Sequence, residues 1–271
     1  MTVYFIGAGP GAPDLITVRG ARILGRCRTC LYAGSLVPPE LLDLCPPDAT
    51  LVNTARMPLG DIISRIVDAD SSGHDIARLH SGDLSLYSAL TEQQRELRAR
   101  GIGYEIVPGV PAFAAAAAAL DVELTTPGVG QSLLITRVST LSTDMPPGEE
   151  LSRLAATGVT LALHLAAHRA EQIVDALAPH YGAECPTATV AFASRPDQQV
   201  IRCALRELPA ALAEAGIRRT AVIFVGRVLD PHTHPGVTDS YLYSHARMGK
   251  LRSDPGSVQL SLIHISEPTR L

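Results

Sequence analysis

The stretch VYFIGAGPG, at residues 3–11, decides the fold class of this chain. Residues 3–6 form a short apolar run typical of a buried strand, and the glycine-rich turn of residues 7–11 follows at once. Residues 14–24 then show a helical pattern of apolar positions. A strand, a glycine turn and a helix in this order predict the first unit of an α/β fold.

Strand and helix patterns alternate along the rest of the chain. The runs that predict further strands are residues 29–32, 51–53, 75–80, 103–107, 133–137, 160–165, 187–193, 199–203 and 221–225. The helical patterns are residues 61–68, 86–100, 112–120, 169–178 and 208–215. Such alternation predicts a mostly parallel sheet whose crossovers are covered by helices. We expect two α/β lobes joined near Asp121, with residues 1–120 in the N-terminal lobe, 121–252 in the C-terminal lobe and 253–271 as a tail.

The composition narrows the classes of function. The chain has 271 residues, 46% of them hydrophobic, and a formal net charge of -4, so it has material for a large core and lacks the basic excess that nucleic acid binding requires. The apolar run at residues 112–120 is too short to span a bilayer, and no signal peptide is evident. Five scattered cysteines favour free thiols. We therefore expect a cytoplasmic enzyme that binds neither nucleic acid nor membranes.

Two short patterns raise the question of a metal site. Cys27 and Cys30 form a C-x-x-C pair, which is either half of a zinc or redox site or two unrelated thiols. No second pair completes the site, so the second interpretation is favoured. His232 and His234 lie among Pro and Gly residues, which indicates a solvated loop. The sequence therefore predicts no metal.

Residues 260–270 read LSLIHISEPTR. This string resembles the translation of an adapter used in DNA sequencing libraries. We interpret it as a sequencing artefact and leave it out of the fold. The alternative is a genuine tail.

Three glycine-containing turns follow predicted strands, at residues 7–11, 81–87 and 108–111. Turns at the carboxyl ends of parallel strands share one edge of the sheet, where such folds bind ligands. The first turn resembles a dinucleotide fingerprint, but Pro10 and Pro13 delay the helix that would close over a pyrophosphate. We expect these glycines to clear space for an uncharged adenosine and an amino-acid group. A nicotinamide-dependent oxidoreductase and a non-catalytic nucleotide-binding protein are the alternatives from other classes.

Five motifs in order resemble those of the tetrapyrrole methylases. They are GAGPGAPDLIT (7–17), HSGDLSLYSA (80–89), VPGVPAFAAAAAAL (107–120), ELTTPGVGQSLLITR (123–137) and RTAVIFVGRVL (219–229), and the resemblance covers residues 3–252. It implies a two-lobed α/β fold with a mostly parallel first sheet, a mixed second sheet and an active-site cleft between the lobes. It also implies a homodimer that uses S-adenosylmethionine to methylate a carboxylate-rich tetrapyrrole.

Within the family, the fourth motif most resembles the branch that methylates C-11 of precorrin-4, in aerobic cobalamin synthesis. Methylation of cobalt-precorrin-4 or of uroporphyrinogen III is the alternative. The chain departs from the family pattern at Leu84 and Ser88, where Pro and Gly are frequent, and at Gly128 and Gly130, where larger residues are expected. The Leu84 form favours the cobalt-free substrate, and the two glycines put the contacts of their loop in doubt.

The resemblance also implies site residues. The positions that match the family's cofactor pocket are Pro10, Gly82, Asp83, Leu86, Ala112, Leu165 and Ala193. We expect Asp83 to orient the cofactor or its loop rather than to act as a base. Arginine suits a substrate carboxylate because its guanidinium pairs with two oxygens at once. Among Arg137, Arg153, Arg169 and Arg195, we favour Arg137, because it lies inside the motif that resembles the C-11 branch. His80 and His164 are candidates for polar contacts, although buried histidines with their hydrogen bonds satisfied are the favoured interpretation.

Methyl transfer from a sulfonium needs little further chemistry. The methyl group is already activated, so a ring carbon can displace it in one in-line step. The protein then mainly aligns the two groups and excludes water. No Ser-His-Asp set is evident in the sequence, and this mechanism requires neither such a set nor a metal ion.

Overall fold

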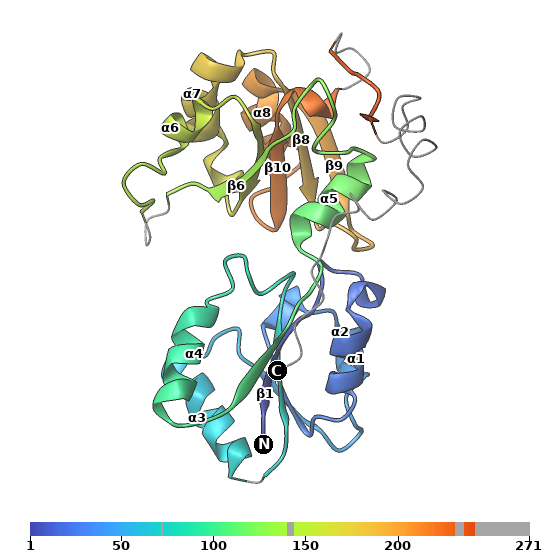
Figure 1. The fold of residues 1–271 in the computed structure, drawn as a ribbon, viewed down its shortest axis with the longest axis vertical. Helices are drawn as coiled ribbons and strands as arrows, with labels where there is room; N and C mark the ends of the chain where they lie inside the picture. The colour runs from blue at the N-terminus through green and yellow to red at the C-terminus, as the bar shows by residue number, and fades with distance from the viewer. Residues whose placement is uncertain (72, 140–143, 231–235, 242–271) are drawn as a thin grey trace, which may run out of the picture.

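The computed structural model describes residues 1–71, 73–139, 144–230 and 236–241. These residues form two lobes, each built on a five-stranded sheet, and the lobes follow one another along the long axis of the molecule (Figure 1). His232, His234 and the tail from residue 253 onwards, with its adapter-like string, lie outside the described residues.

The first sheet is parallel throughout and has the strand order β3-β2-β4-β1-β5. Its strands are β1 (Val3–Gly7), β2 (Thr29–Tyr32), β3 (Thr50–Asn53), β4 (Ile76–His80) and β5 (Tyr104–Val107). Its helices are α1 (Val18–Leu24), α2 (Pro39–Leu42), α3 (Leu59–Asp70) and α4 (Leu90–Ala99), with the short 3-10 helices η1 (Pro13–Leu15) and η2 (Gly34–Leu36). Helices α1 and α2 cover one face and α3 and α4 the other (Figure 1).

Strands β1 and β4 are neighbours at the point where the winding of this lobe reverses. The chain leaves β1 for α1 on one face of the sheet, and it leaves β4 for α4 on the opposite face (Figure 1). The connections that leave the carboxyl ends of two such strands run to opposite faces of the sheet. α/β proteins bind ligands in the crevice between these connections. The fold thus predicts a ligand site at the turns after β1 and β4.

The second sheet is mixed and has the strand order β6-β7-β10-β8-β9. Its strands are β6 (Leu133–Arg137), β7 (Thr160–His164), β8 (Pro186–Ala191), β9 (Gln199–Ala204) and β10 (Ala221–Val225); only β6 and β7 pair in parallel. One face packs on α6 (Leu151–Ala155), α7 (Ala170–Tyr181) and α8 (Leu208–Glu214). The short helices η3 (Ala167–Arg169), η4 (Leu205–Glu207) and η5 (Arg227–Leu229) complete this lobe. The predicted combination of a parallel and a mixed sheet is confirmed.

Helix α5 (Ala112–Leu120) packs on the other face of the second sheet. Ala116, Ala117 and Leu120 are buried against residues of β7, β8 and β10, among them Phe224. Small side chains let the helix lie close to the strands. The sequence assigned residues 112–120 to the first lobe, whereas their packing joins them to the second, and the division at residue 120 stays a prediction.

The predicted elements agree with the structure apart from two short helices. Every predicted strand is present, and so are the predicted longer helices, with shifted ends. Helices α2 and α6 were not predicted, because four or five residues do not show a helical period.

Gly128 is close to the backbone of Gly236, and a side chain at Gly128 would collide with that backbone. This contact accounts for the glycine at a position where the family pattern suggests a larger residue.

The C-x-x-C pair lies in the apolar core of the first lobe. Cys27 and Cys30 are fully buried together with Cys45, and all five cysteines of the chain are free thiols. Burial raises the pKa of Cys27 to about 12, so its thiol is unreactive at neutral pH. Within the described ranges, no group of three or more His, Cys, Asp or Glu side chains is arranged to hold a metal ion, and no helix is both long and apolar enough to cross a bilayer.

Candidate functional site

The three glycine turns of the first lobe pack backbone against backbone. Gly9 and Gly82 exchange two hydrogen bonds, of 3.2 and 2.7 Å. A Cβ atom on Gly7 would lie 2.6 Å from the Cα atom of Gly109, closer than real side chains approach. These glycines therefore allow the turns to meet. All of these glycines are expected from the sequence to clear space for a ligand, and Gly7 and Gly109 also clear space for each other.

Asp83 ties two of these turns together. One carboxylate oxygen accepts a hydrogen bond from the Gly109 amide at 2.8 Å, and the other accepts from the Ser85 amide at 2.8 Å and from the Ser85 hydroxyl. Burial raises the pKa of Asp83, but the hydrogen bonds from Ser85, Gly109 and Leu84 outweigh burial and lower the pKa below its ordinary value. Asp83 is thus a carboxylate at neutral pH, held by donors, which suits an orienting role.

The first turn also contacts the second lobe. The Ala12 amide donates a hydrogen bond of 2.9 Å to the Ser194 hydroxyl, and Gly11 lies against the Arg195 side chain and close to the Ala193 carbonyl. Pro10 and Ala193, two predicted cofactor residues from different lobes, therefore belong to segments that touch. Ala112 begins α5 beside Gly82, with its amide 3.8 Å from a Cβ atom built on that glycine.

Backbone strain gathers on the segments that face each other. Tyr87 and Ala89 in the first lobe, and Leu165, Phe192 and Ser194 in the second, have φ angles between 51° and 66°. Residues with a side chain adopt this left-handed region at a cost of about 1–3 kcal/mol, and they concentrate at functional sites. Leu165, a predicted cofactor residue, also exposes 58% of its surface directly after β7. An exposed apolar side chain beside backbone polar groups suits the uncharged adenosine of S-adenosylmethionine.

Arg137, His164 and Tyr87 mark a second part of the site. Arg137 and His164 end the parallel strands β6 and β7 and are partners in register. The ring of Tyr87, from the loop after β4, lies 5.7 Å from the ring of His164. Burial raises the pKa of Tyr87, while the nearby Arg137 guanidinium lowers it. The structure thus brings the predicted substrate residue next to the loop that contains Leu86, a predicted cofactor residue.

The two histidines differ from the favoured interpretation. In His80 and in His164, the buried Nε2 atom lacks a hydrogen-bond partner in the part of the chain that the structure describes. Burial lowers the pKa of His80 to about 3, with Arg78 acting in the same direction, and burial lowers the pKa of His164 as well. Both rings are therefore neutral at pH 7, and neither is the satisfied histidine that was expected.

The other arginines considered are less suited to a substrate. Arg153 is exposed on α6 and pairs with Glu150 at 3.3 Å. Arg195 pairs with Asp197 at 3.1 Å and lies over the Phe192 ring. Arg169 buries its Nε atom, for which the described residues provide no partner. Arg137 donates to the carbonyls of Val138 and Asp144.

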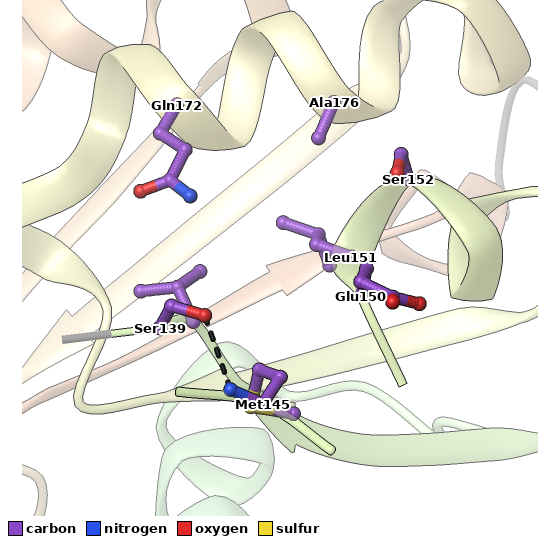
Figure 2. Close-up of a pocket in the computed structure, with 8 residues that line it drawn as sticks. Ser139, Met145, Glu150, Leu151, Ser152, Gln172 and Ala176 are labelled. Atoms are coloured by element: carbon purple, nitrogen blue, oxygen red, sulfur yellow. Dashed lines mark hydrogen bonds between the residues drawn. The ribbon is translucent and has the colours of Figure 1, made fainter. Parts of the chain in front are cut away.

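Two hollows of the second lobe lie away from these segments. One, of about 200 Å³, lies behind the end of β6 between α6 and α7, where Met145 donates to Ser139 (Figure 2). It is smaller than the roughly 300–1,000 Å³ of ordinary ligand sites. The other, of about 560 Å³, lies beside β9, and its Arg202 is bound to the carbonyls of Leu120 and Leu229. Neither contains a predicted site residue.

The geometry argues against a dinucleotide site. Helix α1 begins only at Val18, well after the turn that ends at Gly11, and the Thr17 hydroxyl accepts a hydrogen bond from the Gly20 amide at 3.1 Å. The amide end of this helix is therefore capped by the chain itself. A pyrophosphate needs such amides directly after the glycine turn.

Sequence reasoning missed part of the site. Tyr87, Ser85, Phe192 and Ser194 were not singled out, although they provide hydrogen bonds, ring contacts or strained backbone at the facing segments. Their position next to predicted residues was the available signal. What the sequence does not show is that Tyr87 meets His164, and Ser194 meets Ala12, across the two lobes.

Comparison with known proteins agrees with this geometry. The family model of the Tetrapyrrole (Corrin/Porphyrin) Methylases matches residues 2–209. The precorrin-4 C(11)-methyltransferase of Mycobacterium tuberculosis is 61% identical over 251 residues, which are 92% of this chain and 99% of that protein.

Solved structures show the same fold. The X-ray structure of a cobalt precorrin-4 methyltransferase, a cobalamin biosynthetic enzyme, is 36% identical and superposes with a TM-score of 0.82 over 85% of this chain and 96% of the other. The uroporphyrin-III C-methyltransferase of Thermus thermophilus, complexed with S-adenosylhomocysteine, is 26% identical, with a TM-score of 0.69 over 84% of this chain and 99% of the other.

Proposed function

The chain belongs to the tetrapyrrole (corrin/porphyrin) methylases, and on this premise we propose that it transfers a methyl group from S-adenosylmethionine to C-11 of precorrin-4, giving precorrin-5 in aerobic cobalamin biosynthesis. One observation carries the proposal: the 61% identity with a precorrin-4 C(11)-methyltransferase extends over nearly the full length of that protein. The enzyme is thus a C-methyltransferase that uses S-adenosylmethionine.

Solved structures of enzymes that act on the alternative substrates are less similar to this chain. Their identity is 36% for the cobalt precorrin-4 methyltransferase and 26% for the uroporphyrin-III methyltransferase, although both share the fold. The fold therefore does not decide the ring position, and the proposal rests on the higher identity with the precorrin-4 enzyme. The Leu84 form of the second motif agrees with the cobalt-free substrate.

The facing turns and strand ends fit S-adenosylmethionine. We propose that residues of both lobes hold this cofactor. They are Pro10, Gly82, Asp83 and Leu86 of the first lobe, Ala112 at the start of α5, and Leu165 and Ala193 of the second lobe. When bound, this cofactor supplies an activated methyl group that a ring carbon can displace in line. Asp83 fixes the turns, and the apolar residues exclude water from the reacting atoms.

We propose that Arg137 binds a carboxylate of the tetrapyrrole. Its position at the end of β6, beside His164 and within the electrostatic reach of Tyr87, supports this role. A guanidinium contacts both oxygens of a carboxylate, so that one residue both attracts the substrate and limits its rotation. Orientation of the ring carbon towards the methyl group then follows from binding.

Calorimetric titration tests the cofactor assignment. We expect S-adenosylhomocysteine to bind one site per chain and NAD to give no heat of binding, because α1 begins too far from the glycine turn to hold a pyrophosphate. Tight binding of NAD without a response to S-adenosylhomocysteine would refute the proposed function and restore the oxidoreductase alternative.

We further propose that the enzyme is a cytoplasmic homodimer. The five free thiols support a reducing compartment, and the family resemblance supports the dimer. Light scattering coupled to gel filtration should give twice the 28.7 kDa mass of one chain. A mass of one chain at micromolar concentration would contradict the dimer.

A further inference from the structure

His164 occupies an unusual position for a histidine whose buried Nε2 atom has no hydrogen-bond partner among the described residues. It is the last residue of β7, where Ala162, two positions earlier, is buried under α5. Alternate residues of a strand share a face, so His164 points to the same side of the sheet as Ala162. Arg137, its register partner on β6, shares that side with Ile135. The two side chains therefore stand next to each other at the end of the second sheet that faces the first lobe.

One nitrogen of this ring lacks a partner among the described residues. The Nε2 atom is buried, and no hydrogen bond reaches it in that part of the chain. A buried polar atom without a hydrogen bond destabilises the folded state. Such an atom in a native protein calls for an explanation, and a functional role is one of them.

The ring is partly covered from the other lobe. Tyr87 lies 5.7 Å away with its ring tilted by 46°, and its left-handed φ of 53° shows that the loop after β4 is held in a strained conformation to place it there. Tyr87 nevertheless exposes 46% of its surface. His164 thus lies where segments of both lobes meet, beside the proposed substrate residue Arg137.

We propose that His164 is a specificity-determining residue that donates a hydrogen bond to an acidic side chain of the tetrapyrrole, acting with Arg137 on the same carboxylate. This inference rests on the proposed function. The neutral imidazole supplies one N–H donor, and the guanidinium supplies the charge. A carboxylate has two oxygens that can accept hydrogen bonds from both residues, and its negative charge complements the guanidinium.

Variants of His164 separate hydrogen bonding from packing. His164→Phe keeps a ring under Tyr87 and removes both nitrogens, and His164→Gln restores a donor near the position of Nε2. We expect His164→Phe to raise the Michaelis constant for precorrin-4 by roughly 10- to 100-fold, as for the loss of a hydrogen bond to a charged group. The dissociation constant of S-adenosylhomocysteine and the melting temperature should stay unchanged, and His164→Gln should recover part of the loss. His168→Phe, at an exposed position nearby, is the matched control and should behave as the wild type.

A double variant tests the shared carboxylate. If His164 and Arg137 bind the same group, the combined effect of His164→Phe and Arg137→Ala on the Michaelis constant will be smaller than the product of the single effects. A full product would show that the two residues contact separate groups and would overturn the shared contact.

Two further results would overturn the role of His164. One is an unchanged Michaelis constant in His164→Phe. The other is weaker binding of both ligands together with a lower melting temperature, which would indicate a structural histidine. A wild-type protein that binds S-adenosylhomocysteine but does not methylate precorrin-4 would instead refute the proposed substrate, so the two failures are distinguishable.

Discussion

Asp83 is the residue on which the shape of the candidate cofactor site depends most. Its two carboxylate oxygens hold the turn after β4 and the turn after β5 at the same time, through Ser85 and Gly109. These hydrogen bonds add to the backbone contacts between the glycine turns, so Asp83 contributes electrostatically to the ordering of the site.

Replacing Asp83 should weaken cofactor binding. A hydrogen bond to a charged group contributes about 1.5–3 kcal/mol, so we expect Asp83→Ala to raise the dissociation constant of S-adenosylhomocysteine by at least roughly 10-fold. Asp83→Asn should have a smaller effect, because one oxygen acceptor remains. Titration calorimetry measures both, with Asp68→Ala, an exposed residue of α3, as the control. Equal affinities in all four proteins would exclude the loop from the site.

Arg137 should act on the other ligand. We expect Arg137→Ala to raise the Michaelis constant for the tetrapyrrole by roughly 10- to 150-fold and to leave the affinity for S-adenosylhomocysteine unchanged. Arg137→Lys should recover only part of the loss, since an ammonium group cannot pair with both oxygens in one plane. Initial rates at varied substrate concentration measure the effect. Unchanged kinetics in a well-folded Arg137→Ala protein would rule out the substrate role.

At the scale of elements, a buried arginine links β4 to α4 and to the loop after β3. Arg78 exposes 5% of its surface and donates to Gln93 at 3.1 Å and to Thr54 at 2.9 Å, both neutral. Gln93 in turn donates to the Ala89 carbonyl at 2.9 Å, at the end of the loop that contains Tyr87. Burial lowers the pKa of Arg78 to about 10, so the guanidinium is still charged at neutral pH. The loop at the site is thus anchored from inside the first lobe.

This link gives a prediction about stability. Gln93→Leu leaves a buried charge with one partner fewer, and we expect it to lower the free energy of unfolding by about 3 kcal/mol. Adding Arg78→Met removes the charge itself, so the double variant should be more stable than Gln93→Leu alone. Urea unfolding measures both, with Gln94→Leu on the same helix as the control. A double variant less stable than the single one would show that the charge is not the cause.

Local patterns predicted the elements but not all of their neighbours. The strands could be placed because apolar runs between turns are visible within a few residues, as at residues 221–225. The sheet on which helix α5 packs was not predicted, because an alanine-rich run has no distinct apolar face that indicates which sheet it covers. Residues 151–155 were missed because one helical turn has no period to detect.

At the scale of the whole molecule, the candidate site is a product of two lobes that touch at few points. Ala12 donates to Ser194, Gly11 lies against Arg195, and Tyr87 lies over His164. The glycine turns could be named from sequence because strand ends of a parallel sheet share an edge, and Arg137 could be named because it ends the motif that resembles the C-11 branch. The contacts of Ser194, Tyr87 and His164 could not, because they depend on how the second lobe faces the first.

The central claim is that the chain methylates C-11 of precorrin-4. The most direct test incubates the enzyme with precorrin-4 and S-adenosylmethionine that carries a ¹³C-labelled methyl group, and locates the label in the product by NMR. We predict one new labelled methyl group per tetrapyrrole, attached to C-11, with formation of an equal amount of S-adenosylhomocysteine. A label at another ring carbon, or no transfer by a protein that binds S-adenosylhomocysteine, would contradict the account.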